Sequence, residues 1–362
     1  MKNKIKSRLI EIGSLIVVVI LIGGCIGSDE KIEDKTGEKS AEETEPVEST
    51  IRLECSKMCI TDDPGGSIYG THTLCVRDCF NNYDKKLEIP EIRFPPEPIS
   101  WVECDSCESC AEAIKNAAKG TGVKLIEDIE WEEGTCIHWS KDNITFDCQN
   151  HTIDGWNMED YYGIYLDRTS GNTIRNCIIT YFDNGIKLYG SDDNIIIDNS
   201  VNDNFWGIYI ESYSYRNIII NNTATGNIRG IHLYNGNENY IASNAANDNE
   251  QFGIYLVDSY KNIIINNAAN NNDAERINGG GGIELKYSLR SMLVNNTVNS
   301  NPNGIVLSDS NHNKVIGCIA CSNAVDDIYG GSGYDNFGGS NTCDKIRKFN
   351  DTDTLGCTYK CS

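Results

Sequence analysis

A short phrase, glycine followed by Ile-x-Leu or a close variant, recurs along the chain from residue 163 to residue 307. It begins at Gly163, Gly185, Gly207, Gly230, Gly253, Gly282 and Gly304, in steps of 22, 22, 23, 23, 29 and 22 residues. A second phrase keeps the same step and places an apolar residue two positions after its start, at Asn172, Asn194, Asn217, Asn239, Asn262, Ser291 and Asn313. A period this short predicts a solenoid of stacked coils, each in contact only with its neighbours.

The residue types within each phrase predict strands. In Gly-Ile-x-Leu the first and third residues after the glycine are aliphatic and the middle one varies, which is the period-two alternation of a strand. The second phrase predicts another short strand with its apolar residue directed inward, and a third strand fits within the remaining length. Ile, Tyr, Asn and Gly disfavour a helix here. The repeated glycine is expected to supply a positive φ at a corner of the coil.

Asparagines recur in register after the second strand of each coil. They are Asn199, Asn222, Asn244, Asn267 and Asn296, preceded in register by Cys148 and Cys177 and followed by Cys318. Stacked amides donate and accept hydrogen bonds between coils, so this column predicts a structural asparagine ladder inside a corner. Its eight positions predict about eight coils, at roughly 4.8 Å per coil.

The segments on either side of the repeats carry a family resemblance. Gly134-Thr-Cys136, Asn143-Ile-Thr-Phe-Asp-Cys148 and His151-Thr-Ile-Asp-Gly155 resemble an opening coil, and Gly356-Cys357-Thr-Tyr-Lys-Cys361 resembles a closing segment. The chain thereby resembles the NosD-type right-handed parallel β-helix proteins, also called carbohydrate-binding and sugar-hydrolysis domains. The resemblance covers about 60% of the chain. It implies the fold strongly and one activity only weakly, because such folds host many functions.

The expected fold class is therefore all-β: a right-handed parallel β-helix with a small, Cys-rich, partly helical amino-terminal module. The expected order is a signal peptide (1–24), an acidic linker (25–50), a Cys-rich helical hairpin (51–103), a capping helix with a lead-in segment (104–130), the β-helix (131–342) and a disulfide-rich cap (343–362). The capping helix is expected at Ser109–Lys119, where it would cover the open end of the solenoid.

The amino terminus predicts export and lipid anchoring. Four basic residues precede an apolar run at 12–22, and the run leads into Gly-Gly-Cys25. This resembles a lipoprotein signal with Cys25 as the lipidated residue, since the run is short for a membrane span. The alternative is an uncleaved signal anchor. The expected location is the cell envelope of a prokaryote, in particular an archaeon, on the outer face of the cytoplasmic membrane, and the linker at 28–50 would be a solvated tether.

The chain is strongly acidic, with 53 acidic and 31 basic side chains and a formal charge of −22. Removal of residues 1–24, which carry four basic and one acidic side chain, makes the charge −25. Repulsion from phosphate makes nucleic acid an unsuitable partner. Cations, neutral glycans or basic surfaces are easier partners.

The chain has 16 cysteines, which in an exported protein predict disulfides. The candidates are Cys55, Cys59, Cys75, Cys79, Cys104, Cys107, Cys110, Cys136, Cys148, Cys177, Cys318, Cys321, Cys343, Cys357 and Cys361. The first four resemble a twin-cysteine helical hairpin, with a zinc site as the alternative. The next three are dense enough to suggest an iron–sulfur cluster, but disulfides are favoured, with Cys136 bonded either to this group or to Cys148. The 15 cysteines after Cys25 leave at least one without an intramolecular partner.

The outward positions of the Gly-Ile-x-Leu strands form two columns when coils stack. One column is Tyr165, Lys187, Tyr209, His232, Tyr255, Glu284 and Val306; the other is Asp167, Tyr189, Glu211, Tyr234, Val257, Lys286 and Ser308. Tyrosine faces beside carboxylates and amides can stack on sugars and bond their hydroxyls. The glycan-face candidates are Tyr165, Tyr189, Tyr209, His232, Tyr234, Tyr255 and Glu284. The alternative is that tyrosine simply favours exposed strands.

Catalytic signals are weaker. Asp167 and Glu211 lie two coils apart, near the long end of the range for a glycosidase pair. Lys187 is expected between them, where its ammonium would favour both ionised carboxylates and oppose a general acid. Asp167, Lys187 and Glu211 also suggest a lyase, and calcium is expected only under this alternative. No His, Met and Cys grouping has metal-ligand spacing, so no metal or cofactor is expected.

The favoured function is binding of a glycan or cell-envelope polymer, with the membrane engaged through the lipid anchor. The second hypothesis is a polysaccharide lyase or hydrolase using Asp167, Lys187 and Glu211. The third is a purely structural component of the envelope or surface layer.

Overall fold

A computed structural model describes residues 94–156, 160–273, 279–351 and 357–361. The coils belong to the unit of the chain that contains residues 97–362. The predicted signal peptide, the tether and residues 51–93 of the predicted cysteine hairpin module, including Cys25, Cys55, Cys59, Cys75 and Cys79, lie outside the described residues.

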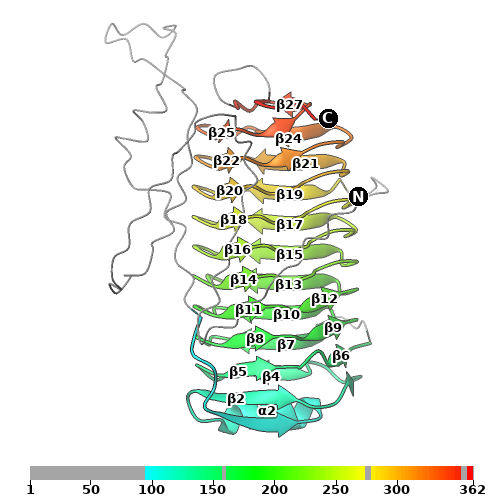
Figure 1. Ribbon diagram of the computed structural model, residues 1–362, viewed down its shortest axis with the longest axis vertical. Coiled ribbons are helices and arrows are strands. Elements are labelled where there is room, and N and C mark those ends of the chain that lie inside the picture. Colours follow the sequence, from blue (N-terminus) through cyan, green and yellow to red (C-terminus); the bar gives the residue numbers. More distant parts are fainter. Residues whose placement is uncertain (1–93, 157–159, 274–278, 352–356, 362) are drawn as a thin grey trace, which may run out of the picture. The chain divides into compact units, whose positions relative to one another are not determined.

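The strands of the stacked coils line up in three main parallel sheets, called A, B and C below. Most coils add one strand to sheet A and one strand to sheet B (Figure 1). Sheet A contains the Gly-Ile-x-Leu strands: β4 (Ile137–Trp139), β7 (Tyr162–Asp167), β10 (Asn184–Tyr189), β13 (Trp206–Glu211), β15 (Arg229–Tyr234), β17 (Phe252–Val257), β19 (Gly281–Lys286), β21 (Asn303–Ser308), β24 (Asp326–Tyr329) and β27 (Ile346–Arg347). All strand pairs in this sheet are parallel, as a solenoid requires.

Sheet B contains the strands of the second phrase and has further strands at both ends. Its strands are β1 (Ser100–Cys104), β2 (Thr121–Leu125), β5 (Thr145–Asp147), β8 (Thr173–Arg175), β11 (Ile195–Ile197), β14 (Ile218–Ile220), β16 (Tyr240–Ala242), β18 (Ile263–Ile265), β20 (Met292–Val294), β22 (Lys314–Ile316) and β25 (Phe337–Gly339). Sheet C holds the third strand of the early coils: β3 (Ile129–Glu130), β6 (Thr152–Asp154), β9 (Ile178–Thr180) and β12 (Ser200–Asn202). A separate pair joins β23 (Ile319–Ala320) to β26 (Thr342–Cys343).

The all-β solenoid is confirmed, with about ten coils rather than the expected eight. Sheet A alone has ten strands. The additional coils were missed because β4, β24 and β27 lack the Gly-Ile-x-Leu phrase. At the first end, α2 (Cys107–Asn116) packs on β1, β2 and β4 and buries Cys107, Cys110 and Ile114. It begins two residues before the expected capping helix because Ser106 forms the N-cap and exchanges hydrogen bonds with Ser109.

The core is made of aligned aliphatic columns. Ile186 pairs with Ile164 on one side and with Ile208 on the other, and all three are fully buried. Stacking identical side chains lets each coil repeat the packing of the one before it.

The repeated glycines serve close packing rather than the expected positive φ. None of the seven glycines that open the phrase has a φ in the left-handed region. Instead, a Cβ added at Gly207 would lie 2.6 Å from the carbonyl oxygen of Gly230 in the next coil. The glycine is therefore needed because neighbouring coils touch backbone to backbone at this corner.

Asparagine ladders run through three corners, although the sequence analysis identified only one. In the expected ladder, the Asn199 backbone N–H and Nδ2 both donate to Asn222 Oδ1, at 3.0 Å each. Asn222 repeats this with Asn244, and its Nδ2 also donates to the carbonyl oxygen of Ile196 at 2.8 Å. The second-phrase asparagines form another ladder. The third contains Asn204, Asn227, Asn249, Asn272, Asn301 and Asn323.

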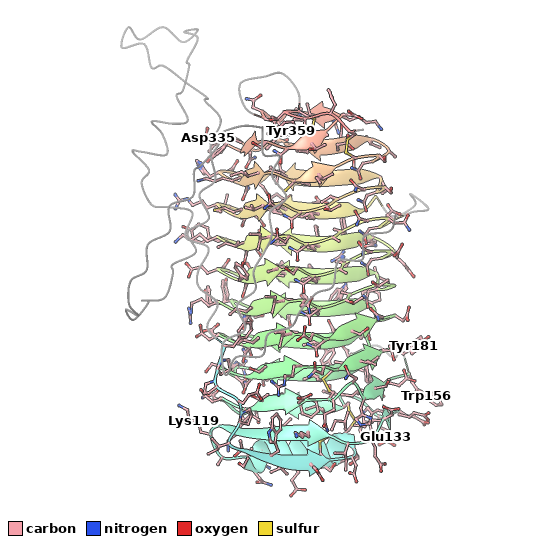
Figure 2. The ribbon with its side chains drawn as sticks, in the orientation of Figure 1. Lys119, Glu133, Trp156, Tyr181, Asp335 and Tyr359 are labelled. Carbon is pink, nitrogen blue, oxygen red and sulfur yellow. A yellow bond between two sulfur atoms is a disulfide. The ribbon has the colours of Figure 1, made fainter. Side chains whose placement is uncertain are left out.

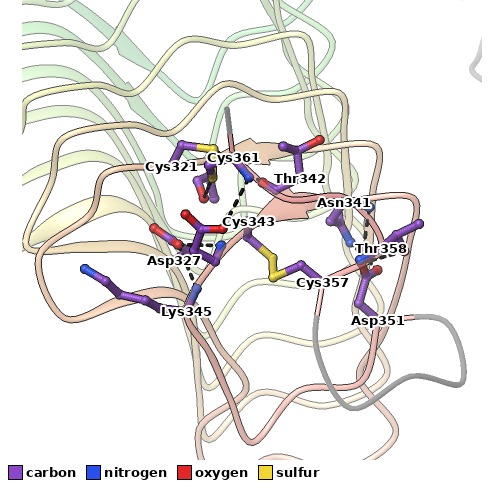
Figure 3. The surroundings of a disulfide bond; sticks show 12 residues. Cys321, Asp327, Asn341, Thr342, Cys343, Lys345, Asp351, Cys357, Thr358 and Cys361 are labelled. Carbon is purple, nitrogen blue, oxygen red and sulfur yellow. Dashed lines mark hydrogen bonds between the residues drawn. A yellow bond between two sulfur atoms is a disulfide. The ribbon is translucent and has the colours of Figure 1, made fainter.

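Two ladders end at the last coils in carboxylates (Figure 3). Asn341 Nδ2 donates to Asp351 Oδ1 at 2.7 Å, and Asn323 Nδ2 donates to Asp327 Oδ1 at 2.8 Å. A carboxylate only accepts hydrogen bonds, so it closes a chain of donors without needing a further coil.

Five disulfides join the described cysteines. They are Cys104–Cys110, Cys107–Cys136, Cys148–Cys177, Cys321–Cys361 and Cys343–Cys357, the last two closing the far end (Figure 3). Cys136 is thus bonded to the dense amino-terminal group rather than to Cys148.

The prediction that Cys318 joins a disulfide is wrong. It is a free, fully buried thiol. Its place in the asparagine ladder puts it between Asn296 and Asn341, so no cysteine stands in register beside it.

Candidate functional site

The two outward columns of sheet A stack as the repeat predicted. Lys187 stands in register between Tyr165 and Tyr209, and Tyr189 stands between Asp167 and Glu211. Further along, Tyr209, His232, Tyr255 and Glu284 are consecutive partners. The same alignment places Tyr234 beside Glu211.

A third outward column, formed by the residues just before the glycines, was missed by the sequence analysis. It includes Tyr162, Trp206, Arg229 and Phe252. The rings of Trp206 and Tyr209 lie 4.4 Å apart, and those of Phe252 and Tyr255 lie 4.5 Å apart. Residues three apart cannot share a face of a regular strand, so the alternation is broken at the glycine. The signal in the sequence was the 23-residue step from Trp206 to Arg229 and from Arg229 to Phe252.

The centre of this surface is a stack of three rings. Tyr209 and His232 have centroids 4.8 Å apart at 23° between planes, and His232 and Tyr255 have centroids 5.2 Å apart at 24°. Their exposed fractions are 6%, 5% and 9%, in contrast to the exposed surface that the sequence analysis expected. The rings cover one another's faces, and Trp206 and Phe252 pack beside them. Offset stacking of this kind leaves no ring face inside the stack for a sugar.

We call the surface formed by these three columns from β7 to β19 the aromatic strip. Its members at the beginning are Tyr162, Tyr165 and Lys187, with the His138 ring stacked on Tyr165 at 5.1 Å. Tyr234 is 41% exposed and is the most exposed ring in the column that also contains Tyr189. The strip crosses six strands, so it is roughly 24 Å long at about 4.8 Å per coil.

Lys187 is held by ring faces and by a carboxylate. Its Nζ lies 4.4 Å from the centroid of Tyr162 and 3.1 Å from Glu211 Oε1. Burial works to lower the pKa of Lys187, but the Glu211 carboxylate and the Tyr162 hydroxyl outweigh it and raise the pKa. The group is therefore a fixed cation at neutral pH.

Arg229 is the second cation of the strip. Its Cζ lies 4.8 Å from the centroid of Tyr255 and 6.0 Å from that of Trp206. Its Nε donates to Gln251 Oε1 at 3.2 Å. Burial lowers its pKa. Among the described residues, no carboxylate lies within ion-pair distance of this guanidinium.

The proposed catalytic set is not assembled as expected. Tyr189, not Lys187, stands between Asp167 and Glu211. Lys187 lies in the neighbouring column and pairs with Glu211, whereas Asp167 lies 3.4 Å from Arg168 Nη1 and 3.8 Å from His138 Nε2. The expected arrangement failed because a residue two positions along a strand belongs to another column.

The last candidate, Glu284, is half-buried next to Tyr255. Burial raises its pKa, and a hydrogen bond with Ser308 together with Lys286 and Arg229 partly opposes the shift. On the long loop before it, Asp273 is buried and accepts a hydrogen bond from the Gly280 backbone N–H at 2.8 Å, so it closes the loop. Glu275 and Arg276 of that loop lie outside the described residues.

Within the described part of the chain, no group of three or more His, Cys, Asp or Glu side chains is placed to hold a metal ion. None of the helices described there is long and apolar enough to cross a bilayer.

The chain is similar in structure to several solved proteins. They include alginate lyase from Paenibacillus sp. str. FPU-7 (17% identity, 72% of this chain and 98% of that one, TM-score 0.55). The mannuronan C-5 epimerase AlgE6 A-module of Azotobacter vinelandii is 14% identical over 71% of this chain and 93% of its own, with a TM-score of 0.53. The Dettilon tailspike protein is 16% identical over 71% of this chain and 64% of its own, also at 0.53. At such identities the likeness shows the fold alone.

Sequence comparison gives the family. No curated protein matches the chain at a significant level. The family described as right-handed beta helix region matches residues 128–267 and 162–320, which together cover more than half of the chain. The parallel sheets of the structure agree with this match, and the chain belongs to the right-handed β-helix family.

Proposed function

We propose that this protein binds a polysaccharide along the aromatic strip. The observation that carries the proposal is the register of the strip: aromatic rings stack from coil to coil on one face, and two fixed cations, Lys187 and Arg229, stand among them. A surface roughly 24 Å long suits an extended polymer better than a single small molecule. The structures of an alginate lyase and a mannuronan epimerase, which have this fold, support the choice of ligand class.

The contacts would differ from simple stacking of sugars on tyrosine faces. Tyr209 and Tyr255 offer ring edges and hydroxyl groups because their faces are covered, whereas both ring nitrogens of His232 are enclosed. Tyr234 and Trp206 offer aromatic surface at the sides, and Lys187 and Glu211 offer charged hydrogen-bond partners.

Binding is favoured over catalysis by the state of Lys187. A lyase base must accept a proton, but the pKa of Lys187 is raised and its Nζ is paired with Glu211. Tyr189 also stands between Asp167 and Glu211, so these two carboxyl groups are not placed as general acid and general base on the same glycosidic bond. A lyase or hydrolase remains the alternative, and a purely structural envelope component is the other.

We also propose that the protein is displayed on the cell envelope through a lipid at Cys25. The supporting features are the apolar run and the Gly-Gly-Cys25 sequence that follows it. Replacement of Cys25 by Ala is expected to release the protein from membranes into the soluble fraction, and retention in the membrane would favour an uncleaved anchor.

A glycan array with the detergent-solubilised full chain tests the main proposal. Tyr234→Ala removes an exposed ring of the strip, and Tyr181→Ala removes a ring of similar exposure, 48%, at a corner after sheet C (Figure 2). We expect Tyr234→Ala to weaken binding about 5-fold or more, as for loss of one aromatic contact, and Tyr181→Ala to change it less than about 2-fold.

Two results would contradict the proposal. Equal losses in the two variants would place binding away from the strip, and absence of any bound glycan would favour the structural alternative. Shortened or unsaturated products from a bound polymer would replace binding with catalysis as the function.

A further inference from the structure

We propose that residues 51–93, which we call the hairpin segment, dock on the outer face of sheet B. This inference goes beyond the proposed function and does not depend on it, because the aromatic strip lies on sheet A. Three features support it: the apolar composition of the face, the burial of its side chains, and the point at which the chain enters the solenoid.

The outer face of sheet B is apolar along five consecutive strands, β11, β14, β16, β18 and β20 (Figure 1). In each strand the middle side chain belongs to the core, as Ile196 and Ile264 do, so the first and third side chains point away from it. These outward residues, which we call the apolar face, are Ile195, Ile197, Ile218, Ile220, Tyr240, Ala242, Ile263, Ile265, Met292 and Val294. On sheet A the same coils carry charged residues such as Glu211 and Arg229. A parallel sheet that is apolar on both faces is normally covered on both.

The side chains at the centre of the apolar face are buried, although they lie outside the core. Ile220 is 6% exposed and Ile265 is 2% exposed. Ile197 and Ile316, at the same position in strands nearer the two ends, are only half-buried. All four side chains have partners on both sides within the sheet, so stacking does not explain the difference. In the described part of the chain, no helix or strand packs over this face. The burial therefore requires a cover beyond the described helices and strands.

The chain enters the solenoid on this side. Both carboxylate oxygens of Glu97 accept hydrogen bonds from the Arg175 guanidinium, at 2.6 and 2.9 Å. Arg175 ends β8, and its partner in the next strand is Ile197 of the apolar face. Trp101 of β1 lies on the same side, since its ring centroid is 5.5 Å from Arg175 Cζ. The chain that leads into Glu97 therefore starts one strand away from the apolar face.

The sequence of the hairpin segment suits an apolar partner. Four apolar residues recur at steps of four, three and four: Val76, Phe80, Tyr83 and Leu87. This spacing predicts an apolar stripe along the second helix of the expected hairpin. The stripe would be about 16 Å long, and the buried centre of the face, from β14 to β20, is about 14 Å across. The tether at 28–50 has no such stripe, since its only large aliphatic residues are Ile32 and Val47.

The connection is long enough for this docking. Residues 88–96 join the stripe to Glu97 and can extend over roughly 30 Å. Five strand spacings separate β8 from β20, which is about 24 Å. The stripe can therefore reach every strand of the apolar face.

Photo-cross-linking in the detergent-solubilised full chain tests this inference. The photoreactive residue p-benzoylphenylalanine replaces Tyr240 at the centre of the apolar face. In a second protein it replaces Met292, which is only half-buried, so this substitution disturbs the packing less. The matched control carries the same residue in place of Tyr181, which is exposed after sheet C. Mass spectrometry of digests identifies the cross-linked peptides, and thermal unfolding confirms that each protein is folded.

We expect positions 240 and 292 to cross-link to a peptide of the hairpin segment in the same chain, and position 181 not to do so. Phe80→Asp should lower this yield about 5-fold or more, because a charge opposes burial of the stripe. Val47→Asp, in the tether, should leave the yield unchanged.

Three results would overturn the inference. Cross-links between two chains would make the apolar face an interface between copies. Cross-links to detergent or lipid alone would make it a membrane-facing surface. Equal yields from positions 240, 292 and 181, or no cross-link to the hairpin segment from either position on the face, would show that the segment does not dock there.

Discussion

Lys187 Nζ lies 3.1 Å from Glu211 Oε1, across two neighbouring coils of sheet A. The two side chains are 13% and 17% exposed, so water screens their attraction only partly. Lys187 also lies 3.4 Å from the Tyr162 hydroxyl, in the coil before it. One side chain therefore links three coils on the outward face.

This ion pair should stabilise the protein in a pH-dependent way. We expect Lys187→Met to lower the free energy of unfolding by about 2 kcal/mol at pH 7, because the Glu211 carboxylate loses its partner in a mostly buried position. The folded pKa of Lys187 is raised above its unfolded value, so its contribution is complete below about pH 10.4 and is lost as pH rises through the folded pKa. Denaturant titrations of both proteins between pH 7 and 11.5 measure the difference, which should be constant up to about pH 10 and then shrink. A difference that stays constant to the end of this range would contradict the assignment.

The asparagine ladders should be the most sensitive part of the interior. Asn222 Nδ2 donates to Ile196 O, Ile220 O and Asn244 Oδ1, and its Oδ1 accepts from Asn199. We expect Asn222→Ala to cost about 3 kcal/mol or more, since it leaves several buried groups unsatisfied. Asn222→Ser should cost less, because the hydroxyl of Ser291 already fills one ladder position and accepts from the Asn262 N–H. Chemical denaturation ranks the two variants, and equal costs would mean that lost packing, not lost hydrogen bonding, dominates.

Cys318 should behave as an inert thiol that occupies an asparagine site. Burial raises its pKa to about 11, so the reactive thiolate is scarce at pH 8 and a thiol reagent should label it only after unfolding. Cys318→Asn should restore the amide ladder between Asn296 and Asn341 and raise the free energy of unfolding by about 1 kcal/mol. Timed alkylation with mass spectrometry and denaturant titration check the two effects. Rapid labelling of the folded protein would show that this corner opens.

The repeat predicted the fold because every coil satisfies the same local requirements. The aliphatic positions, the coil spacing and one asparagine ladder could all be identified from residue type and step alone. The terminal coils could not, because β4, β24 and β27 lack the glycine of the phrase and keep only its first aliphatic residue, as Ile137, Ile328 and Ile346.

The candidate site was harder to predict than the fold. Simple alternation placed Lys187 and Tyr209 correctly but gave no reason to add Trp206 and Arg229, since the glycine that follows each of them inside the strand breaks the period of two. The burial of His232 also has no sequence signal, because the rings that cover it, Trp206 and Tyr209, belong to the preceding coil. The third asparagine ladder is different, since Asn204, Asn227 and Asn249 already repeat at 23 and 22 residues in the sequence.

The most direct measurement of the central claim is the fluorescence of Trp206 during titration with a bound polysaccharide. Trp206 packs on Tyr209 and His232 in the middle of the aromatic strip, so an occupied strip must change its surroundings. We expect a saturable change in emission that follows the calorimetric affinity and disappears in Trp206→Phe, although that variant still binds. An emission change of the same size in Trp206→Phe would arise from another tryptophan and would contradict binding at the strip.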